Sequence, residues 1–282
     1  MNDLEYKKQI LDTKSASFCG AKWYNATIWL GSGMTTSCHH PLPHRASEEV
    51  VRANYKALAN TSIRKQERAE MQKGIRCNGC DYCWRVEDLG SSQISDRVYK
   101  TVLYEDDALE QAYNSNPEDD FDLKYLEISF DRTCNLACSY CNPAFSSTWV
   151  KDIKNNGPYE VLQTDAQDHY THAHDDAGKY DHEDANPYVE AFFKWWEADL
   201  NRTLTHLRLT GGEPLMSKHT WKLLEWFESN KRDLYFAINS NLISKQELID
   251  KLIKASKNIG DFNVYTSCES VGHRAEYIRD GF

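Results

Sequence analysis

Short apolar runs alternate with amphipathic stretches in the second half of the chain. Four runs have the length and composition of strands: residues 125–130, 204–210, 234–239 and 262–267. Three stretches with helical spacing separate them, starting at about residue 147, at 218–231 and at 245–256. Such alternation predicts βαβ units and a parallel sheet, open or barrel-like, with functional residues just past the carboxyl ends of the strands.

The first half of the chain has a different pattern. Residues 47–74 contain two helical stretches, with Ser47 and Thr61 as caps and Gly74 as a stop. The segment N-S-N-P-E-D-D at 114–120 is typical of a linker, which predicts one domain at 1–118 and another at 119–282. A polar stretch at about 155–187, rich in Asp and His, is expected to be a surface insertion or a lid.

Composition narrows the class of protein. The chain has 282 residues, of which 40% are hydrophobic and 27% charged, enough for more than one domain. A net charge of -10 without a basic cluster argues against a nucleic-acid partner. No apolar run approaches membrane length and the start M-N-D-L-E-Y-K-K lacks a secretory core, so we expect a cytoplasmic protein without a membrane partner.

Three cysteines lie within eight positions directly after the first predicted strand of this half. Residues 134–141 read C-N-L-A-C-S-Y-C, which places Cys134, Cys138 and Cys141 in one loop. In a reducing compartment such spacing indicates metal or cluster ligation rather than disulfides. Structural zinc sites normally have four protein ligands, whereas an iron–sulfur cube held by three thiolates keeps one iron open to another ligand.

This loop resembles the CX3CX2C loop of the radical S-adenosylmethionine enzymes, including the aromatic Tyr140 before the last cysteine. The resemblance implies a TIM-type (β/α) barrel, here partial with about four strands. It also implies that Cys134, Cys138 and Cys141 ligate a [4Fe-4S] cluster whose open iron binds S-adenosylmethionine. One electron would then cleave this cofactor to methionine and a 5′-deoxyadenosyl radical, which takes a hydrogen atom from the substrate.

A glycine-rich segment follows the second predicted strand. Residues 207–214 read L-R-L-T-G-G-E-P and resemble the family's GGE motif, which implies that Gly211, Gly212 and Glu213 contact the methionine part of the cofactor. A plain strand-to-helix turn is the alternative. The resemblance also places polar cofactor contacts at later strand ends, where ordinary capping is an equal alternative. The residues concerned are Asn239, Asn241, Ser267 and Glu269.

A second group of cysteines lies near the amino terminus. Cys19, Gly33 and Cys38 match a C-X13-G-X4-C pattern, and C-N-G-C-D-Y-C-W occupies residues 77–84. The segment resembles the twitch domain, a short relative of the SPASM domain, which carries an auxiliary [4Fe-4S] cluster. The resemblance implies that Cys19, Cys38, Cys80 and Cys83 are the ligands, with Cys77 as a possible substitute for Cys80. A zinc site is the alternative that CX2C spacing alone favours.

Several features fall outside these motifs. The sequence reaches Phe282 soon after the fourth predicted strand, fewer strands than family barrels have. We therefore expect an exposed sheet edge, covered by a second copy or by another chain. Trp195 and Trp196 are expected in the core, and Cys268 as a small buried residue. Four histidines in the insertion suit a solvated loop better than a metal site. These are His169, His172, His174 and His182.

The leading hypothesis is a radical S-adenosylmethionine enzyme with two [4Fe-4S] clusters. The resemblance implies a reductant such as flavodoxin or ferredoxin and an unidentified substrate, either a peptide or a small metabolite. No residue is assigned a catalytic role beyond cofactor binding. The alternative is a non-catalytic module, a degenerate or split barrel stabilised by zinc or a cluster.

Overall fold

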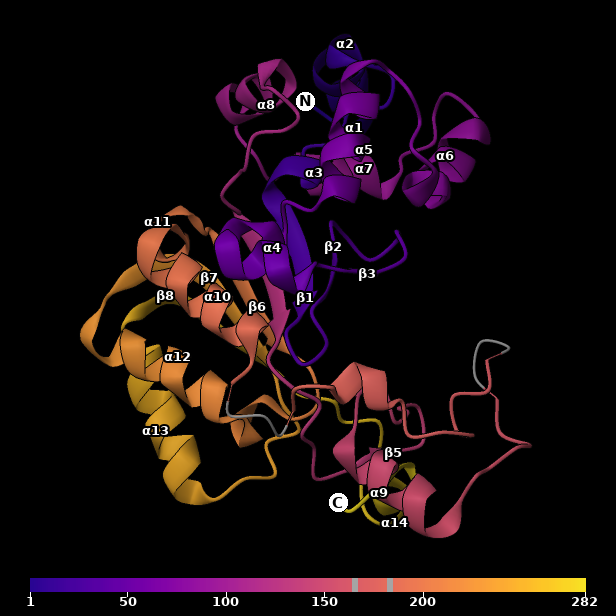
Figure 1. The fold of residues 1–282 in the computed structure, drawn as a ribbon, viewed down its shortest axis with the longest axis vertical. Coiled ribbons are helices and arrows are strands. Elements are labelled where there is room, and N and C mark those ends of the chain that lie inside the picture. The colour runs from indigo at the N-terminus through magenta and orange to yellow at the C-terminus, as the bar shows by residue number, and fades with distance from the viewer. Residues whose placement is uncertain (164–166, 182–184) are drawn as a thin grey trace. The chain divides into compact units, whose positions relative to one another are not determined.

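The computed structural model describes residues 1–163, 167–181 and 185–282, and the chain forms two compact units (Figure 1). Unit 1 comprises residues 1–28, 34–126 and 191–204. Unit 2 comprises residues 29–33, 127–190 and 205–282. Each unit is therefore built from segments that are distant in sequence. The division into domains at residues 1–118 and 119–282 stays a prediction.

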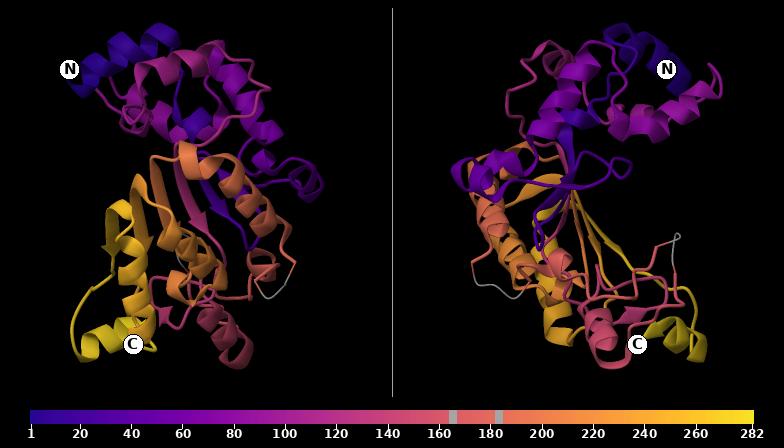
Figure 2. Two further views of the ribbon diagram at one scale, coloured as in Figure 1. Left: turned by 90° about the vertical axis from the view of Figure 1, so that its left-hand side faces the viewer. Right: turned by 45° about the vertical axis from the view of Figure 1, so that its right-hand side comes forward.

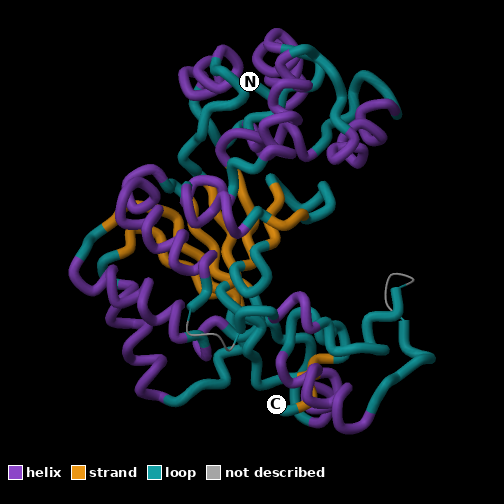
Figure 3. Tube along the Cα trace, viewed as in Figure 1, coloured by secondary structure: helices purple, strands orange, loops and turns teal. Residues whose placement is uncertain are grey.

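Unit 1 is mainly helical (Figure 3). Ser47 and Thr61 cap two of its helices, because their hydroxyls accept hydrogen bonds from the backbone N–H groups of Val50 and Arg64. Its strands follow the order β3-β2-β1 along the sheet. The helices are α1 (Asp3–Tyr6), α2 (Asp12–Lys14), α3 (Ala21–Tyr24), α4 (Glu48–Ala53), α5 (Ser62–Gln72), α6 (Asp81–Asp88), α7 (Asp96–Thr101), α8 (Asp106–Asn114) and α11 (Asn201–Thr203). The strands are β1 (Asn25–Trp29), β2 (Met34–Thr36) and β3 (His44–Arg45), and α10 (Pro187–Trp195) begins in unit 2 and continues into unit 1.

Unit 2 alternates strands and helices. Its strands follow the order β4-β6-β7-β8, and β6, β7 and β8 are parallel. A separate antiparallel pair, β5 with β9, lies outside this sheet. The strands are β4 (Tyr125–Ser129), which starts in unit 1, β5 (Ala137–Cys138), β6 (His206–Thr210), β7 (Arg232–Asn239), β8 (Ile259–Tyr265) and β9 (Arg279–Asp280). The helices are α9 (Ser147–Asn156), α12 (Lys218–Ser229), α13 (Gln246–Ser256) and α14 (His273–Ile278).

Helices α12 and α13 cover one face of β6, β7 and β8 (Figure 2). Phe227 of α12 meets Phe236 of β7 edge to face, with ring centroids 5.5 Å apart, and Phe236 stacks on Phe262 of β8. The four predicted strands and three predicted helices agree with the observed elements to within a few residues. A mixed α/β unit with a largely parallel sheet is therefore confirmed.

Three outcomes concern residues outside the motifs. Trp195 and Trp196 are buried, as expected for core aromatics. The expectation for Cys268 was wrong: it is exposed, because β8 ends at Tyr265 and the cysteine lies in the following loop. Among the described residues, no helix combines the length and the apolar character needed to cross a membrane.

Candidate functional site

The loop that follows β4 places three cysteines beside α9. The Cys134 backbone N–H donates to the Ser147 hydroxyl at 3.0 Å, and the indole of Trp149 donates to the Cys138 carbonyl at 2.9 Å. Cys138 also belongs to β5, which pairs with β9. Helix and strand thus fix the loop backbone at two points.

The three thiols open on one pocket at the carboxyl end of the parallel sheet. This pocket is open to solvent and has a volume of about 230 Å³. Burial raises the pKa of Cys134, and it raises the pKa of Cys141 to about 11, so ligation here would release protons. The other predicted site residues that line the pocket are Tyr140, Gly211, Gly212, Glu213, Asn239, Asn241 and Ser267.

The glycine turn after β6 packs tightly against the start of the cysteine loop. A Cβ on Gly211 would come within 2.4 Å of the Ser129 hydroxyl, and one on Gly212 within 2.3 Å of the Thr133 carbonyl oxygen. Gly211 also has φ +118, a backbone conformation that side chains disfavour. The missing side chains therefore let the two segments meet, in addition to any approach by a ligand.

We expect Gly212→Ala to loosen the cysteine loop. The new methyl group has to displace backbone at Thr133, next to Cys134, and such overpacking costs about 1–3 kcal/mol of unfolding free energy. Denaturant unfolding and iron content measure the effect. Gly74→Ala is the control, because it pays for its φ of +73 but meets nothing within 4 Å. An unchanged iron content in Gly212→Ala would contradict the expected coupling.

Glu213 organises the loop after β7. Its buried carboxylate accepts hydrogen bonds from the Leu215 N–H at 3.0 Å, the Ser240 hydroxyl at 2.7 Å and the Asn241 N–H at 2.7 Å. The Asn241 side chain in turn donates to Asn135 of the cysteine loop at 2.8 Å. One carboxylate thus connects three segments of the pocket wall. Cofactor contact by Glu213 stays a prediction.

Glu213→Gln is expected to destabilise unit 2 and displace residues 240–242. The amide has one acceptor oxygen, so one donor that now faces the carboxylate would face an N–H₂ group, at a cost of about 1–3 kcal/mol. Thermal unfolding and crystallography of the variant test this. The matched control is Glu225→Gln, which removes an exposed ion pair with Lys251 and is expected to change stability by less than about 1 kcal/mol.

The remaining strand ends differ in their roles. Asn239 and Ser267 are exposed and line the pocket. Glu269 instead pairs with the buried Arg279, with Nε and Nη2 of the arginine 2.7 and 3.1 Å from its carboxylate oxygens. Hydrogen bonds from Arg279 lower the pKa of Glu269 to about 2, so the pair is ionised at neutral pH. Glu269 is the one predicted site residue of unit 2 that does not line the pocket.

Sequence reasoning missed several residues of this wall. Arg279 lines the pocket, and its guanidinium lies 5.8 Å from the centre of the Tyr140 ring. Nothing in the sequence indicated it, because β9 has two residues and lies far from the cysteines along the chain. Ser240, by contrast, stands between two predicted residues in the motif N-S-N and could have been included.

Unit 1 gathers the amino-terminal cysteines in its core. A small cavity of about 20 Å³ is lined by Cys19, Cys38, Cys80 and Cys83, the four predicted ligands, all of them buried. Burial is the main cause that raises the pKa of Cys19, Cys38 and Cys83. For Cys80, the hydrogen bond with Cys77 raises the pKa most, and burial raises it further. Cys77 is also buried but lines a neighbouring groove instead of this cavity.

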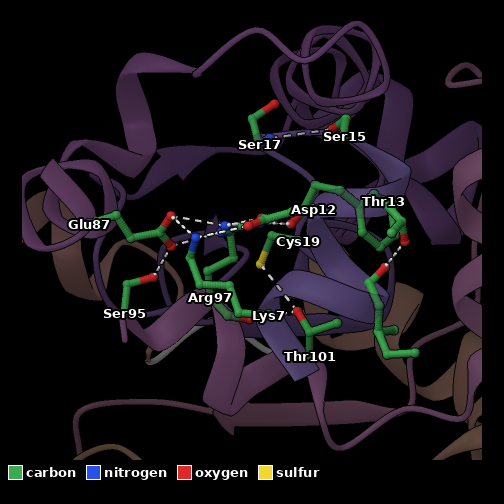
Figure 4. Close-up of polar contacts among 12 residues, drawn as sticks. Lys7, Asp12, Thr13, Ser15, Ser17, Cys19, Glu87, Ser95, Arg97 and Thr101 are labelled. Atoms are coloured by element: carbon green, nitrogen blue, oxygen red, sulfur yellow. Dashed lines mark hydrogen bonds and ion pairs between the residues drawn. The ribbon is translucent and has the colours of Figure 1, made fainter. Parts of the chain in front are cut away.

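Buried cations surround these thiols. Lys22 is fully buried and pairs with Glu67 at 2.5 Å. Arg97 donates to Glu87 and Asp12 at 2.9 Å, as Figure 4 shows. Figure 4 also shows the Thr101 hydroxyl donating to the Cys19 sulfur, at 3.8 Å. Positive charge in a core is costly unless anions accompany it. Glu67, Glu87 and Asp12 already accompany these cations, so the cations by themselves do not indicate a metal centre.

The histidines of the insertion do not form a metal site in the part that the structure describes. His172 stacks on His174 with centroids 3.9 Å apart, and His174 contacts the backbone carbonyl of His169. Across residues 1–163, 167–181 and 185–282, no group of three or more His, Cys, Asp or Glu side chains is arranged to hold a metal ion, and this includes both cysteine groups, so metal ligation by these cysteines stays a prediction. His182 lies outside these ranges.

A cysteine loop after β4 and a glycine turn after β6 that share one pocket are typical of radical S-adenosylmethionine enzymes. The curated proteins that match the chain include GTP 3′,8-cyclases. The chain is 25% identical to that of Aliarcobacter butzleri over 149 residues, which are 53% of the chain and 35% of the relative. Identity is also 25% over 158 residues to that of Campylobacter jejuni subsp. doylei (55% and 38%) and over 152 residues to that of Desulforamulus reducens (54% and 35%).

These matches relate the chain to the radical S-adenosylmethionine superfamily, to which GTP 3′,8-cyclases belong. The matched region spans less than two-fifths of the length of these relatives. No family model matches the chain. No solved structure matches it either.

Proposed function

We propose that the protein is a radical S-adenosylmethionine enzyme that acts on a peptide or a small metabolite. The observation that supports this best is the shared pocket: three thiols from one loop and the glycine turn from another line it together. Curated relatives that belong to the same superfamily add independent support.

Cys134, Cys138 and Cys141 would hold a [4Fe-4S] cluster at this pocket. When bound, the cluster supplies the electron that splits S-adenosylmethionine into methionine and a 5′-deoxyadenosyl radical, which takes hydrogen from the substrate. The donor set fits, because three thiolates leave one iron for an outside ligand.

The chain itself provides binding and position. Asn239 and Ser267 are exposed in the pocket, where they can donate hydrogen bonds to the cofactor. Glu213 and Asn241 hold the pocket wall through their contacts with Ser240 and Asn135. Tyr140 lies against the cationic Arg279, which faces the pocket from the opposite strand of the β5–β9 pair. These side chains would orient the cofactor and exclude water from it.

Cys19, Cys38, Cys80 and Cys83 are proposed to hold an auxiliary [4Fe-4S] cluster, with Cys77 as a possible substitute for Cys80. With four thiolates engaged, its role would be electron transfer or structural support. Zinc suits the same four thiols. Iron, sulfide and zinc analysis of anaerobically prepared protein distinguishes the two metals.

The proposed partners follow from the chemistry. A reductant such as flavodoxin or ferredoxin would supply the electron. The edge strand β8, with Val264 and Tyr265 exposed, is a proposed contact for a second copy or another chain. Size-exclusion chromatography with light scattering at several protein concentrations tests the association.

Electron paramagnetic resonance of the anaerobically reconstituted, reduced protein tests the function. We expect the cluster signal to change when S-adenosylmethionine is added, and 5′-deoxyadenosine to accumulate. Zinc in the loop, or a signal that ignores S-adenosylmethionine, would contradict the proposal. That result would favour a non-catalytic module stabilised by zinc or a cluster.

A further inference from the structure

The backbone carbonyls of all three cysteines in the loop after β4 accept hydrogen bonds from side chains. The hydroxyl of Thr148 donates to the Cys134 carbonyl at 2.7 Å, and the indole of Trp149 donates to the Cys138 carbonyl at 2.9 Å. Both donors belong to the first turn of α9. The donor for the carbonyl of Cys141 comes instead from the polar insertion.

Tyr170 of the insertion supports this third carbonyl. Its hydroxyl donates to the Cys141 carbonyl at 2.7 Å, and its side chain is buried. Its ring lies against the ring of Trp149, with centroids 5.0 Å apart. The insertion does not bury its apolar residues in general, because Val161 is 92% exposed. The burial of Tyr170 therefore reflects its own contacts with the cysteine loop and α9.

Arg132 fastens the insertion to both ends of the cysteine loop. It precedes the three cysteines, and its Nη1 donates to the carbonyl of Pro143, which follows them, at 2.9 Å. Nη1 also lies 2.8 Å from the carbonyl oxygen of Ala173, and Nε lies 2.9 Å from the Asp181 carboxylate. The Arg132 and Asp181 side chains are only 10% and 3% exposed, and a buried pair is much costlier to break than an exposed one. The described stretch 167–181, which contains Tyr170, is thus anchored beside the loop.

We propose that Tyr170 is a positioning residue for the iron–sulfur cluster proposed at this loop. By holding the Cys141 carbonyl, it keeps that thiol in place relative to the thiols of Cys134 and Cys138, with which it lines the pocket. Groups that orient the ligands of a metal centre typically change metal affinity by about tenfold or more when they are lost. The inference rests on the proposed function, because only a centre shared by the three thiols needs this alignment. The polar insertion thereby becomes part of the cluster site.

Hydrogen exchange of the metal-free full chain tests the support directly. The Cys141 N–H donates to the Cys138 carbonyl at 2.9 Å, so its exchange reports opening of the loop. Tyr170→Phe keeps the ring and removes the donor. We expect the protected amides of residues 139–146 to exchange about fivefold faster in this variant, which corresponds to the loss of one hydrogen bond.

Tyr159→Phe is the matched control. The Tyr159 hydroxyl donates to Asp152 of α9 at 2.8 Å, so this variant loses a tyrosine hydrogen bond of the same insertion outside the cysteine loop and is expected to exchange like wild type. Wild-type exchange in Tyr170→Phe, or equal acceleration in both variants, would overturn the proposal. Circular dichroism checks the fold of Tyr170→Phe. If it misfolds, Asp181→Asn, which weakens the anchor at Arg132, must accelerate exchange instead, and wild-type exchange there also overturns the proposal.

The reconstituted chain shows whether this support serves the cluster. The S-adenosylmethionine-sensitive resonance signal is followed while a ferrous chelator removes iron. We expect the signal of Tyr170→Phe to have an altered line shape and to decay about tenfold faster than that of wild type. A tyrosine with a merely structural role would change neither, and that result overturns the proposal even if exchange is faster. A wild-type chain without such a signal contradicts the proposed function instead, and hydrogen exchange alone then decides whether Tyr170 positions Cys141.

Discussion

Cys138→Ser is expected to abolish 5′-deoxyadenosine formation and to remove one cluster. In the proposed site the Cys138 thiolate is a cluster ligand, and a serine hydroxyl is a poor replacement at neutral pH. If both centres are [4Fe-4S], iron falls from about eight to about four per chain. The residual iron belongs to unit 1, whose thiols are not touched by the substitution. Iron analysis, resonance spectra and product assay measure the three effects.

Cys268→Ser is the matched control for this result. Cys268 is exposed and lies outside both cysteine groups, so its variant is expected to keep its iron, its spectrum and its activity. Retention of the S-adenosylmethionine-sensitive signal by Cys138→Ser would show that this cysteine is not a ligand. Cys134→Ser and Cys141→Ser would then be needed to locate the centre, and the loop assignment would fail if both retained it.

The second large effect is expected from Cys80→Ser. Cys80 lines the cavity with Cys19, Cys38 and Cys83, and the buried Lys22 lies beside it. Losing the metal would remove its binding free energy from the folded state and leave the buried thiols unlinked, which is expected to lower the free energy of unfolding. Metal content and thermal unfolding measure the change, best in a Cys138→Ser background where unit 1 holds the remaining metal.

Cys77→Ser is the natural comparison, since the two cysteines are neighbours that differ in what they face. Cys77 lines the groove beside the cavity, so its variant is expected to keep the metal and most of its stability. The reverse pattern, with metal lost from Cys77→Ser and kept in Cys80→Ser, would make Cys77 the ligand. Loss in both variants would mean that neither thiol alone completes the centre.

Much of unit 2 could be predicted because its signals are local. Each strand of the sheet in unit 2 spans five or more residues with regularly placed apolar positions, and each helix has its own amphipathic period. The carboxyl-end rule then places the cysteine loop and the glycine turn at one edge. Cys134, Gly212 and Asn239 line one pocket, as this rule predicts for residues that follow the strands.

The parts that could not be predicted depend on distant pairings. The two-residue strands β5 and β9 are too short for a period, so neither their pairing nor the position of Arg279 could be seen in the sequence. Residues 191–204 belong to unit 1 although the residues before and after them belong to unit 2, and no local sequence pattern predicts such an assignment. Glu213 shows another limit, because sequence cannot tell whether a carboxylate will meet a ligand or the chain's own N–H groups.

The β5–β9 pair also bears on how the protein matures. Arg279 of β9 pairs with Cys138 of β5, and 279 − 138 gives 141 residues of synthesis between the two. At about 5–20 residues per second, a ribosome needs roughly 7–30 s to make that stretch. During this interval the nascent cysteine loop lacks one of the two supports that fix its backbone. Iron and sulfide delivery to it is therefore expected to follow translation rather than to accompany it.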